Sequence, residues 1–256
     1  MLNTITEGAP NGTPPLLVAH GLFGAARNWG VLQKRMAASR QVIAVDMRNH
    51  GESPHLPSHS YPDMAADLAE VIAAHGGRAD VLGHSMGGKA AMALALTQPD
   101  LVNRLIVADI APVAYTHSQA DKIMALRQVD LPSVTRRSEA DAQLKPHLAD
   151  DMLRAFLLQS LRLGEGGASW RLNLDVLERD MGHIIGWPEV SGQYEGETLF
   201  LRGELSDYVQ PAHAAHITAL FPNARTESIA GANHWLHAEK PREFQAAVEG
   251  FLGEVI

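Results

Sequence analysis

The sequence predicts one α/β domain, in which helices cover both faces of a mostly parallel sheet and a helical insertion separates two of the strands. Short apolar runs alternate with helical patterns along the chain, which is the order of repeated βαβ units. The alternation stops at Val113, and only helical patterns follow as far as Tyr194. A length of 256 residues suits a single domain of this class.

The strands of the predicted sheet are short and continuously apolar. Runs of this kind are typical of parallel strands that are covered on both faces. They occur at Leu16–Ala19, Gln41–Asp46, Ala79–Gly83, Arg104–Asp109, Thr198–Gly203 and Ala224–Ile229. We expect these segments to form the sheet.

Helices are predicted between these strands. Over Tyr61–His75 the apolar residues recur at the spacing of one buried helical stripe, formed by Met64, Leu68, Val71 and Ile72. Gly87–Gln98 is rich in Ala, Met and Leu and stops before Pro99. Pro241–Leu252 begins with a proline, which suits a first helical turn, and is apolar along one face.

The segment 113–194 breaks the alternation. Its helical patterns lie at Gln119–Gln128, Ser138–Leu148, Asp150–Leu163 and Trp170–Arg179, and Leu163–Ser169 is predicted to be a flexible loop. We therefore expect a core domain of residues 1–112 and 195–256 and a helical cap of residues 113–194. Because parallel sheets bind ligands at the carboxyl ends of their strands, this insertion is a candidate lid.

The composition argues against several classes of function. A formal net charge of −8 disfavours a nucleic-acid partner, since phosphate backbones need clustered Lys and Arg. The absence of cysteine excludes disulfides and a cysteine nucleophile, and it is consistent with a cytoplasmic location. Met1–Pro15 lacks the pattern of a signal peptide, and no apolar run approaches the ~20 residues that cross a bilayer. The 13 histidines lack a matching carboxylate cluster, so we expect no metal and no cofactor.

The segment Gly83-His84-Ser85-Met86-Gly87 matches the G-x-S-x-G pattern of a nucleophile elbow. A serine on a sharp strand-to-helix turn needs small neighbours, and Gly83 and Gly87 provide them. About one chain in ten of this composition would contain the pattern by chance. Here a predicted strand precedes it and a predicted helix follows it, which favours a nucleophilic Ser85 over a solvated serine in a Gly-rich turn.

A second glycine-containing loop, His20-Gly21-Leu22-Phe23-Gly24, follows the first apolar run. We expect the backbone N–H groups of Leu22 and Met86 to form an oxyanion hole, in which a single donor can change the rate by ~10²–10³. The alternative is an ordinary turn at the end of a strand.

His234 is the candidate general base. It lies in a loop after the last predicted strand and before the last helix, and an imidazole beside Ser85 can take and return the hydroxyl proton. His237 belongs to the approach to the final helix, and the His84 side chain should diverge from that of Ser85. The alternative is a buried histidine that bonds to the backbone.

Two aspartates are candidates for the acid that orients the imidazole. Asp109 ends one predicted strand, and Asp207 follows another. Both would lie near the carboxyl edge of the sheet, and the sequence does not rank them by geometry. We expect a structural role for the polar turn that contains Asp46, Arg48, His50 and Ser53, because such turns satisfy backbone groups.

Five segments together resemble the small bacterial esterases of the YbfF type, which have the α/β-hydrolase fold: His20–Gly24, Asp46–Ser53, Gly83–Gly88, Asp109–Pro112 and Gly231–Trp235. The resemblance extends over the whole chain, including the insertion. It implies an abhydrolase-domain esterase that cleaves acyl esters and sometimes acyl-CoA thioesters, with its nucleophile and base at Ser85 and His234. Members can lack an acid at the position of Asp207, so the resemblance favours Asp109, whereas the wider superfamily favours Asp207.

The expected partner is a small acyl ester of short to medium chain, or a thioester. An apolar pocket is the usual site for such a ligand, and we expect it to be lined by Phe23, Tyr115, Met124, Phe156, Trp187 and Trp235. Aromatic and Met side chains at helical spacing are equally consistent with simple packing. The residues leave the oligomeric state open.

Other activities of the same fold give alternative interpretations. Haloalkane dehalogenases and epoxide hydrolases place an aspartate at the elbow, where this chain has Ser85. A lyase similar to the menaquinone-pathway member of the fold could retain the same three catalytic groups. A non-catalytic binding protein would be expected to have lost part of the set.

Overall fold

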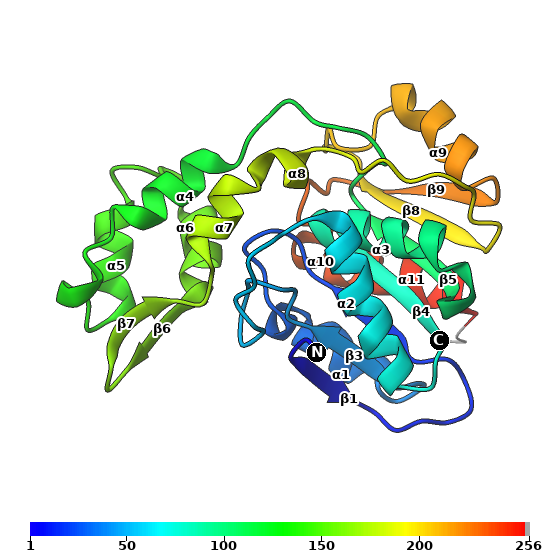
Figure 1. Ribbon diagram of the computed structural model, residues 1–256, viewed down its shortest axis with the longest axis horizontal. Coiled ribbons are helices and arrows are strands. Elements are labelled where there is room, and N and C mark those ends of the chain that lie inside the picture. The colour runs from blue at the N-terminus through cyan, green and yellow to red at the C-terminus, as the bar shows by residue number, and fades with distance from the viewer. Residues whose placement is uncertain (254–256) are drawn as a thin grey trace.

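The structure, a computed structural model, describes residues 1–253 of the chain. Within these residues a seven-stranded sheet has the order β1-β3-β2-β4-β5-β8-β9 (Figure 1), and only the β1–β3 pair is antiparallel. The strands are β1 (Thr4–Glu7), β2 (Leu16–Ala19), β3 (Val42–Val45), β4 (Ala79–His84), β5 (Val102–Ala108), β8 (Thr198–Gly203) and β9 (Ala224–Ile229). Every segment predicted to be a strand lies in this sheet, which confirms the α/β prediction. The edge strand β1 was not predicted.

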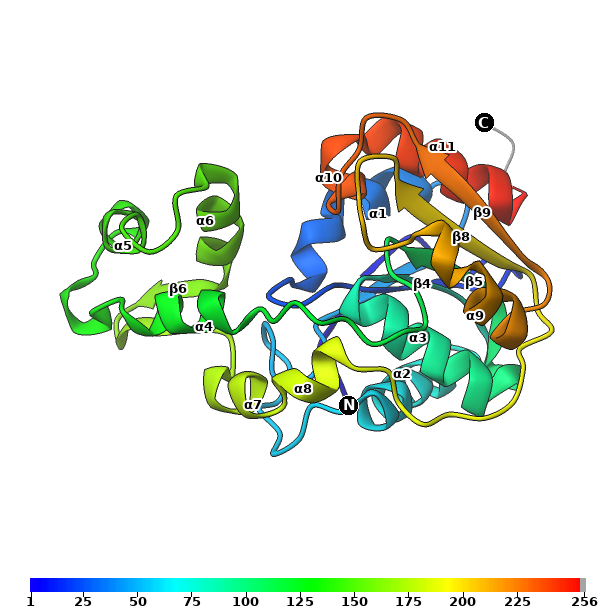
Figure 2. The ribbon, with the colours of Figure 1, turned by 90° about the horizontal axis from the view of Figure 1, so that it is seen from above.

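Helices cover both faces of the sheet (Figure 2). One layer contains α2 (Tyr61–Ala74), α3 (Met86–Thr97) and α9 (Ala214–Leu220), and the other contains α1 (Gly30–Met36), α10 (Leu236–Glu239) and α11 (Pro241–Leu252). Successive side chains of a strand point to opposite faces, so each strand contributes to both cores. In β2, Leu17 and Ala19 join the core beneath α2 and α3, whereas Leu16 and Val18 join the other.

Helix α2 shows how the sequence pattern produces the packing. Ser60 caps its start by accepting a hydrogen bond from the backbone N–H of Asp63 (3.3 Å), and Pro62 lies in the first turn. The predicted stripe is buried against the core, and it consists of Met64, Leu68, Val71 and Ile72. Burying each large side chain of this kind stabilises the fold by about 1.5–3 kcal/mol.

Helix α3 lies directly behind the elbow and is buried along most of its length, from Met86 to Leu96. Small alanine side chains let it approach both the sheet and α2 closely.

Among residues 1–253, no helix is both long enough and apolar enough to span a membrane.

A buried ion pair fixes the beginning of β4. The Asp80 carboxylate is fully buried and accepts hydrogen bonds from Arg40 (2.8 Å) and from the Asn103 side chain (2.7 Å). Removing one partner of such a pair leaves a buried charge uncompensated, which typically costs about 3–5 kcal/mol. These contacts hold β4 in position at the end of the strand opposite to the elbow.

Between β5 and β8 the chain leaves the sheet and forms the group of elements on the left of Figure 1. It contains α4 (Ala120–Arg127), α5 (Arg137–Leu144), α6 (Asp151–Leu157), β6 (Leu161–Gly164), β7 (Gly167–Trp170), α7 (Leu174–Arg179) and α8 (Met181–Ile185). The four helical patterns of the sequence correspond to α4, α5, α6 and α7. All four are shorter than predicted, and the largest differences are that α5 ends at Leu144, α6 ends at Leu157 and α7 begins at Leu174.

The prediction of an insertion with only helical patterns and a flexible loop at Leu163–Ser169 was wrong. Strands β6 and β7 form an antiparallel hairpin there, in which Leu161 pairs with Trp170 and Gly164 with Gly167. Two residues connect them, and Gly167 has a φ of 89°, a conformation that glycine adopts without strain. The strand pattern was missed because only Leu161 of β6 is buried, so the segment has no continuous apolar run.

Candidate active site

Ser85 lies on a strained turn between the last residue of β4 and the first residue of α3. Its φ of 52° and ψ of −118° are unfavourable for a residue with a side chain, and they raise the hydroxyl above the sheet edge. The two glycines of the motif leave room for this turn. A Cβ at Gly83 would lie 2.3 Å from the carbonyl oxygen of Gly87, and one at Gly87 would lie 2.4 Å from that of Ala19.

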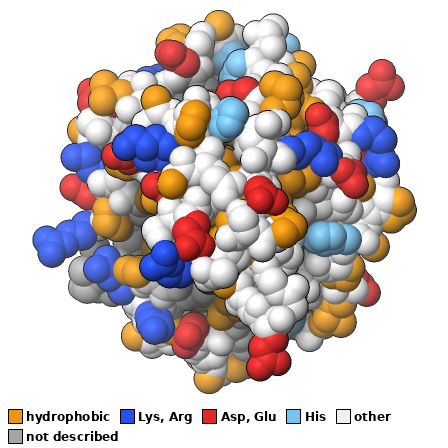
Figure 3. Space-filling view, turned by 90° about the vertical axis from the view of Figure 1, so that its left-hand side faces the viewer, with side chains coloured by type: hydrophobic (Ala, Val, Ile, Leu, Met, Phe, Trp, Pro, Cys, Tyr) orange, Lys and Arg blue, Asp and Glu red, His pale blue; other side chains and the backbone are white. Residues whose placement is uncertain are grey.

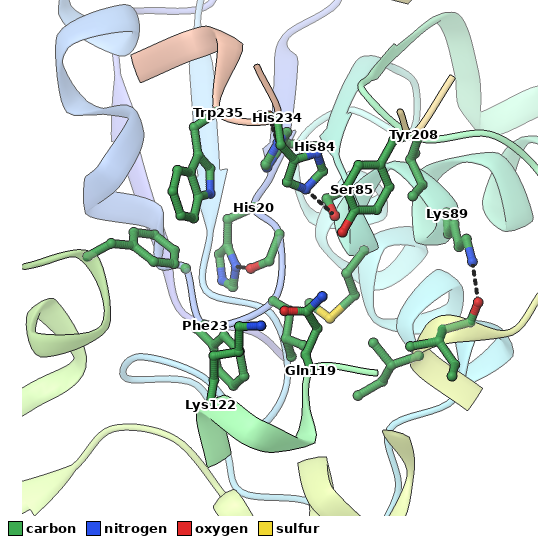
Figure 4. A pocket seen from close by; sticks show the side chains of 18 of the residues that line it. His20, Phe23, His84, Ser85, Lys89, Gln119, Lys122, Tyr208, His234 and Trp235 are labelled. Atoms are coloured by element: carbon green, nitrogen blue, oxygen red, sulfur yellow. Dashed lines mark hydrogen bonds between the residues drawn. The ribbon is translucent and has the colours of Figure 1, made fainter. Parts of the chain in front are cut away.

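A chain of hydrogen bonds joins Ser85, His234 and Asp109. The Nε2 atom of His234 lies 3.1 Å from Ser85 Oγ, and its Nδ1 atom lies 2.8 Å from Asp109 Oδ2. The three residues come from the end of β4, the loop after β9 and the end of β5, and Figure 4 shows the imidazole directed at the serine. A carboxylate acceptor at Nδ1 favours the tautomer whose Nε2 lone pair can accept the serine proton.

The Asp109 carboxylate is fully buried, yet its hydrogen-bonding capacity is used. Besides His234, it accepts hydrogen bonds from the backbone N–H of Gly203 (2.9 Å) and from the hydroxyl of Ser206. A buried carboxylate without such donors would be strongly destabilising. The side chain is therefore fixed in the orientation that meets the imidazole.

Asp207, the other candidate acid, is exposed at the surface and lies in none of these contacts. The loop after β8 turns the Ser206 side chain inward to Asp109, so the next side chain in the chain points outward. The structure thus brings Asp109, and not Asp207, to His234.

The residues of the two expected oxyanion donors, Leu22 and Met86, lie at the same cavity. Within residues 1–253, neither the N–H of Leu22 nor that of Met86 donates to a protein acceptor, whereas the neighbouring N–H of Phe23 does. Met86 is the first residue of α3, where backbone N–H groups have no partner inside the helix. Both residues line the cavity in front of Ser85.

This cavity encloses about 880 Å³ of empty space, part of it open to solvent. Four of the side chains expected to line it do so, namely Phe23, Tyr115, Phe156 and Trp235, and Figure 4 shows Phe23 and Trp235 at the cavity. The ring centroids of Phe156 and Trp235 are 5.4 Å apart. Met124 and Trp187 are not part of its wall. The Met124 side chain lies on the outer face of α4 and is 54% exposed, and Trp187 packs against the main core instead.

Two residues around the site carry no motif and were missed. The Tyr208 ring stacks on the His234 imidazole with 3.9 Å between the ring centroids, and the Ser206 hydroxyl donates to Asp109. His84, which belongs to the elbow motif and was not expected to act as the base, donates from Nε2 to the His234 carbonyl oxygen (2.9 Å). The short polar sequence around Ser206 and Tyr208 has no spacing that would have distinguished it from an ordinary loop.

Lys89 was also missed, although it follows Ser85 by one helical turn. Its ammonium group is buried in the cavity wall (Figure 4). It donates to the carbonyl oxygens of Ile185 (3.0 Å) and Gly186 (2.5 Å), at the end of α8. Burial lowers the pKa of Lys89 to about 7. This lysine ties the end of the insertion to the core helix that carries the nucleophile.

Several histidines near the site are buried in the neutral form. Burial lowers the pKa of His59 to about 3, and it has the same effect on His237, whose ring stacks on Trp29 at 4.3 Å. Burial also holds the pKa of His50 and of His84 well below its ordinary value. A positive charge on any of these rings is disfavoured in the folded protein.

The free energy of unfolding is expected to decrease when the pH is lowered from about 6.5 toward 3, the window set by His59 and His237. Their ordinary pKa of 6.5 applies to the unfolded chain, which therefore binds more protons than the folded protein below that pH. The contribution of these two groups to the free energy of unfolding is fully present above pH 6.5 and is lost on acidification. Urea unfolding midpoints at constant ionic strength check this, and a midpoint that stays constant between about pH 7 and pH 5 would contradict it.

Comparison with known proteins gives consistent matches. Residues 14–241 match the family described as the alpha/beta hydrolase fold. The sn-1-specific diacylglycerol lipase ABHD11 of Mus musculus is 43% identical over 248 residues, which cover 93% of this chain and 81% of that protein. Esterase YbfF of Escherichia coli K12 is 39% identical over 257 residues, which cover 99% of both. Among solved structures, a marine microorganism esterase superposes with a TM-score of 0.93 at 36% identity, covering 98% of both chains.

Proposed function

Since this chain belongs to the α/β-hydrolase family and is a carboxylic ester hydrolase, we propose that it cleaves short to medium acyl esters through an acyl-enzyme on Ser85. The observation that carries the proposal is the hydrogen-bonded chain from Ser85 through His234 to Asp109 at the wall of the cavity. A nucleophile, a base and a group that orients the base are the parts that acyl transfer requires.

In the acylation step, His234 Nε2 removes the Ser85 hydroxyl proton while Oγ attacks the ester carbonyl carbon. The C=O π bond opens, and the negative charge on its oxygen is stabilised by the N–H groups of Leu22 and Met86. When the tetrahedral intermediate collapses, the bond to the alkoxy oxygen breaks and His234 gives its proton to that oxygen. The alcohol leaves, and the acyl group remains on Ser85.

Deacylation repeats the sequence with water as the nucleophile. His234 takes a proton from the water, whose oxygen attacks the acyl carbon, and the imidazolium then returns the proton to Ser85 Oγ. Asp109 accepts the Nδ1–H bond throughout and stabilises the imidazolium that forms in each half-reaction. The carboxylic acid product and the free enzyme result.

The substrate class follows from the cavity. Its wall is mostly apolar, and the aromatic pair of Phe156 from the insertion and Trp235 from the core suits an aliphatic acyl chain or alcohol. Thioesters with a similar acyl group are a further candidate, since the same intermediate forms on Ser85. We propose that residues 113–194 act as a cap over residues 1–112 and 195–256, because the insertion supplies Phe156 and Leu153 to this wall.

The charge pattern of the surface argues against a nucleic-acid partner. On the face in Figure 3, Lys and Arg side chains are interspersed with Asp and Glu and form no continuous basic stripe of the kind that binds nucleic acid.

The absence of cysteine suits a reducing compartment, so the proposed location is the cytoplasm.

A substrate panel tests the proposed class. We expect turnover of p-nitrophenyl acyl esters, with the highest kcat/KM at short to medium chain length, and we would measure acyl-CoA thioesters of the same lengths beside them. A dicarboxylate substrate of the related lyase serves as the comparison. Turnover of that compound by elimination, without turnover of any ester or thioester, would overturn the proposal in favour of a lyase.

A further inference from the structure

The loop between β3 and α2, residues 46–60, has a connection to the oxyanion loop that goes beyond the proposed catalytic groups. It contributes two fully buried histidines, His50 and His59, which lie beside His20 of the oxyanion loop. The ring centroids of His20 and His50 are 5.1 Å apart, and those of His50 and His59 are 5.4 Å apart. Three buried imidazoles in contact, without a carboxylate between them, need a reason beyond packing.

His20 fixes the peptide unit that precedes the Leu22 side chain. Its Nε2 atom accepts a hydrogen bond from the backbone N–H of Met47 (2.9 Å), which leaves the proton on Nδ1. That Nδ1–H donates to the carbonyl oxygen of Gly21 (2.8 Å). The carbonyl of Gly21 and the N–H of Leu22 belong to one planar trans peptide, so fixing the oxygen also fixes the direction of the opposing N–H.

His50 fixes the peptide unit on the other side of Leu22. Its Nδ1–H donates to the carbonyl oxygen of Arg48 (2.9 Å), so its Nε2 lone pair is free to accept the backbone N–H of Phe23 (3.2 Å). Phe23 has a φ of 65°, an unfavourable conformation that persists only where neighbours enforce it. The two imidazoles thus hold both peptide units that determine the orientation of the Leu22 N–H.

The same loop, residues 46–60, also contacts Met86, whose N–H is the second expected oxyanion donor, and it contacts the insertion. His59 Nε2 lies 3.2 Å from the sulfur of Met86. On its outer side the loop is held by the insertion, because Asn49 accepts hydrogen bonds from the backbone and side chain of Asn173 (both 3.0 Å) and His59 N–H donates to Asp180 (2.8 Å). The loop is therefore fixed from both sides and cannot shift without moving the hole.

We propose that His20 and His50 are positioning residues for the oxyanion hole, whose neutral imidazoles fix the two peptide units that flank Leu22. This inference rests on the proposed acyl transfer at Ser85. Neither ring touches the reacting atoms, and both act through the direction of one N–H group. The contribution should appear in the transition state, where the oxyanion carries its charge, and not in the binding of the neutral ester.

Two substitutions at His50 separate positioning from packing. His50→Phe keeps a ring but removes the acceptor, whereas His50→Gln keeps an acceptor near Nε2. We expect His50→Phe to lower kcat for a p-nitrophenyl ester about 10- to 100-fold, with KM changed less than about threefold, since one donor of such a hole is worth ~10²–10³. His50→Gln should recover most of the loss. The exposed His216 gives the matched control, since His216→Phe should leave kcat unchanged.

A trifluoromethyl ketone, whose hemiketal oxygen occupies the hole, gives a second readout. Its affinity should fall in His50→Phe by the same factor as kcat, and native thermal unfolding shows that the variant is folded. If the variant does not fold, ¹⁵N spectra of the wild-type protein labelled at histidine still test the inference, since His20 and His50 must both be neutral with the proton on Nδ1.

Three results would overturn the proposal: wild-type kcat in His50→Phe, equal losses in the Phe and Gln variants, or a different tautomer at either histidine. Failure of the proposed function is a separate outcome. It would appear as full activity in Ser85→Ala. Turnover that depends on Ser85 but is unchanged in His50→Phe would overturn only the positioning role.

Discussion

Replacing Ser85 with alanine is expected to lower kcat for p-nitrophenyl acyl esters by about 10⁴–10⁶-fold while leaving the fold intact. The substitution removes the atom proposed to form the acyl-enzyme, so that only substrate binding and the proposed oxyanion donors would remain. Among residues 1–253 the hydroxyl forms a hydrogen bond only with the His234 side chain, so its loss costs little packing. Initial rates with purified protein, beside circular dichroism and thermal unfolding, measure both effects.

The exposed Ser133 in the insertion provides the matched control for this experiment. Ser133→Ala removes a hydroxyl of the same kind far from the cavity wall and should retain wild-type kcat. Residual activity above about 1% in Ser85→Ala, with a wild-type thermal transition, would be incompatible with a nucleophilic Ser85.

Asp109→Asn is expected to reduce kcat about 10⁴-fold, whereas Asp207→Asn should change it less than about twofold. An asparagine at position 109 cannot stabilise the imidazolium, and its amide can present a donor to Nδ1, which favours the tautomer that cannot accept the serine proton. Asp207 is exposed and makes no contact with the imidazole. The comparison of the two variants under identical conditions identifies the acid, and a larger loss in Asp207→Asn would reverse the assignment.

Parts of the fold with a strong local signal could be predicted from the sequence. The strands β2, β3, β4, β5 and β8 of the main sheet are buried along most of their length and therefore have continuous apolar runs, whereas the edge strand β9 is largely exposed. The buried apolar stripe of α2 and the proline at the start of α11 likewise made those helices predictable from the sequence. In contrast, β1 and the β6–β7 hairpin are short strands in which half or more of the side chains are exposed, so their patterns resemble loops.

The site was predictable where a motif imposes the backbone and unpredictable where a loop decides a side-chain direction. Gly83 and Gly87 are needed because any Cβ there would collide with backbone oxygens. The choice between Asp109 and Asp207 depends on which side chain the loop after β8 turns inward, and no spacing encodes that. Met124 was misplaced for the same reason: the residue is apolar, but its side chain lies on the outer face of α4.

The polar turn after β3 illustrates a different limit. Its residues were expected to be structural, and their hydrogen bonds to backbone groups agree with that. What the sequence could not show is the destination of those bonds, since His50 and Phe23 are 27 residues apart and meet only in the folded protein. A structural role and a positioning role are therefore not exclusive at this turn.

Reaction with a fluorophosphonate, followed by peptide mapping in a mass spectrometer, tests directly whether Ser85 is the activated nucleophile. The reagent phosphonylates an activated serine by displacement of fluoride, so we expect one adduct per chain, on Ser85, and no labelling of Ser85→Ala. An adduct on any other residue, or undiminished labelling of the alanine variant, would contradict the claim that Ser85 is the hydroxyl that His234 activates.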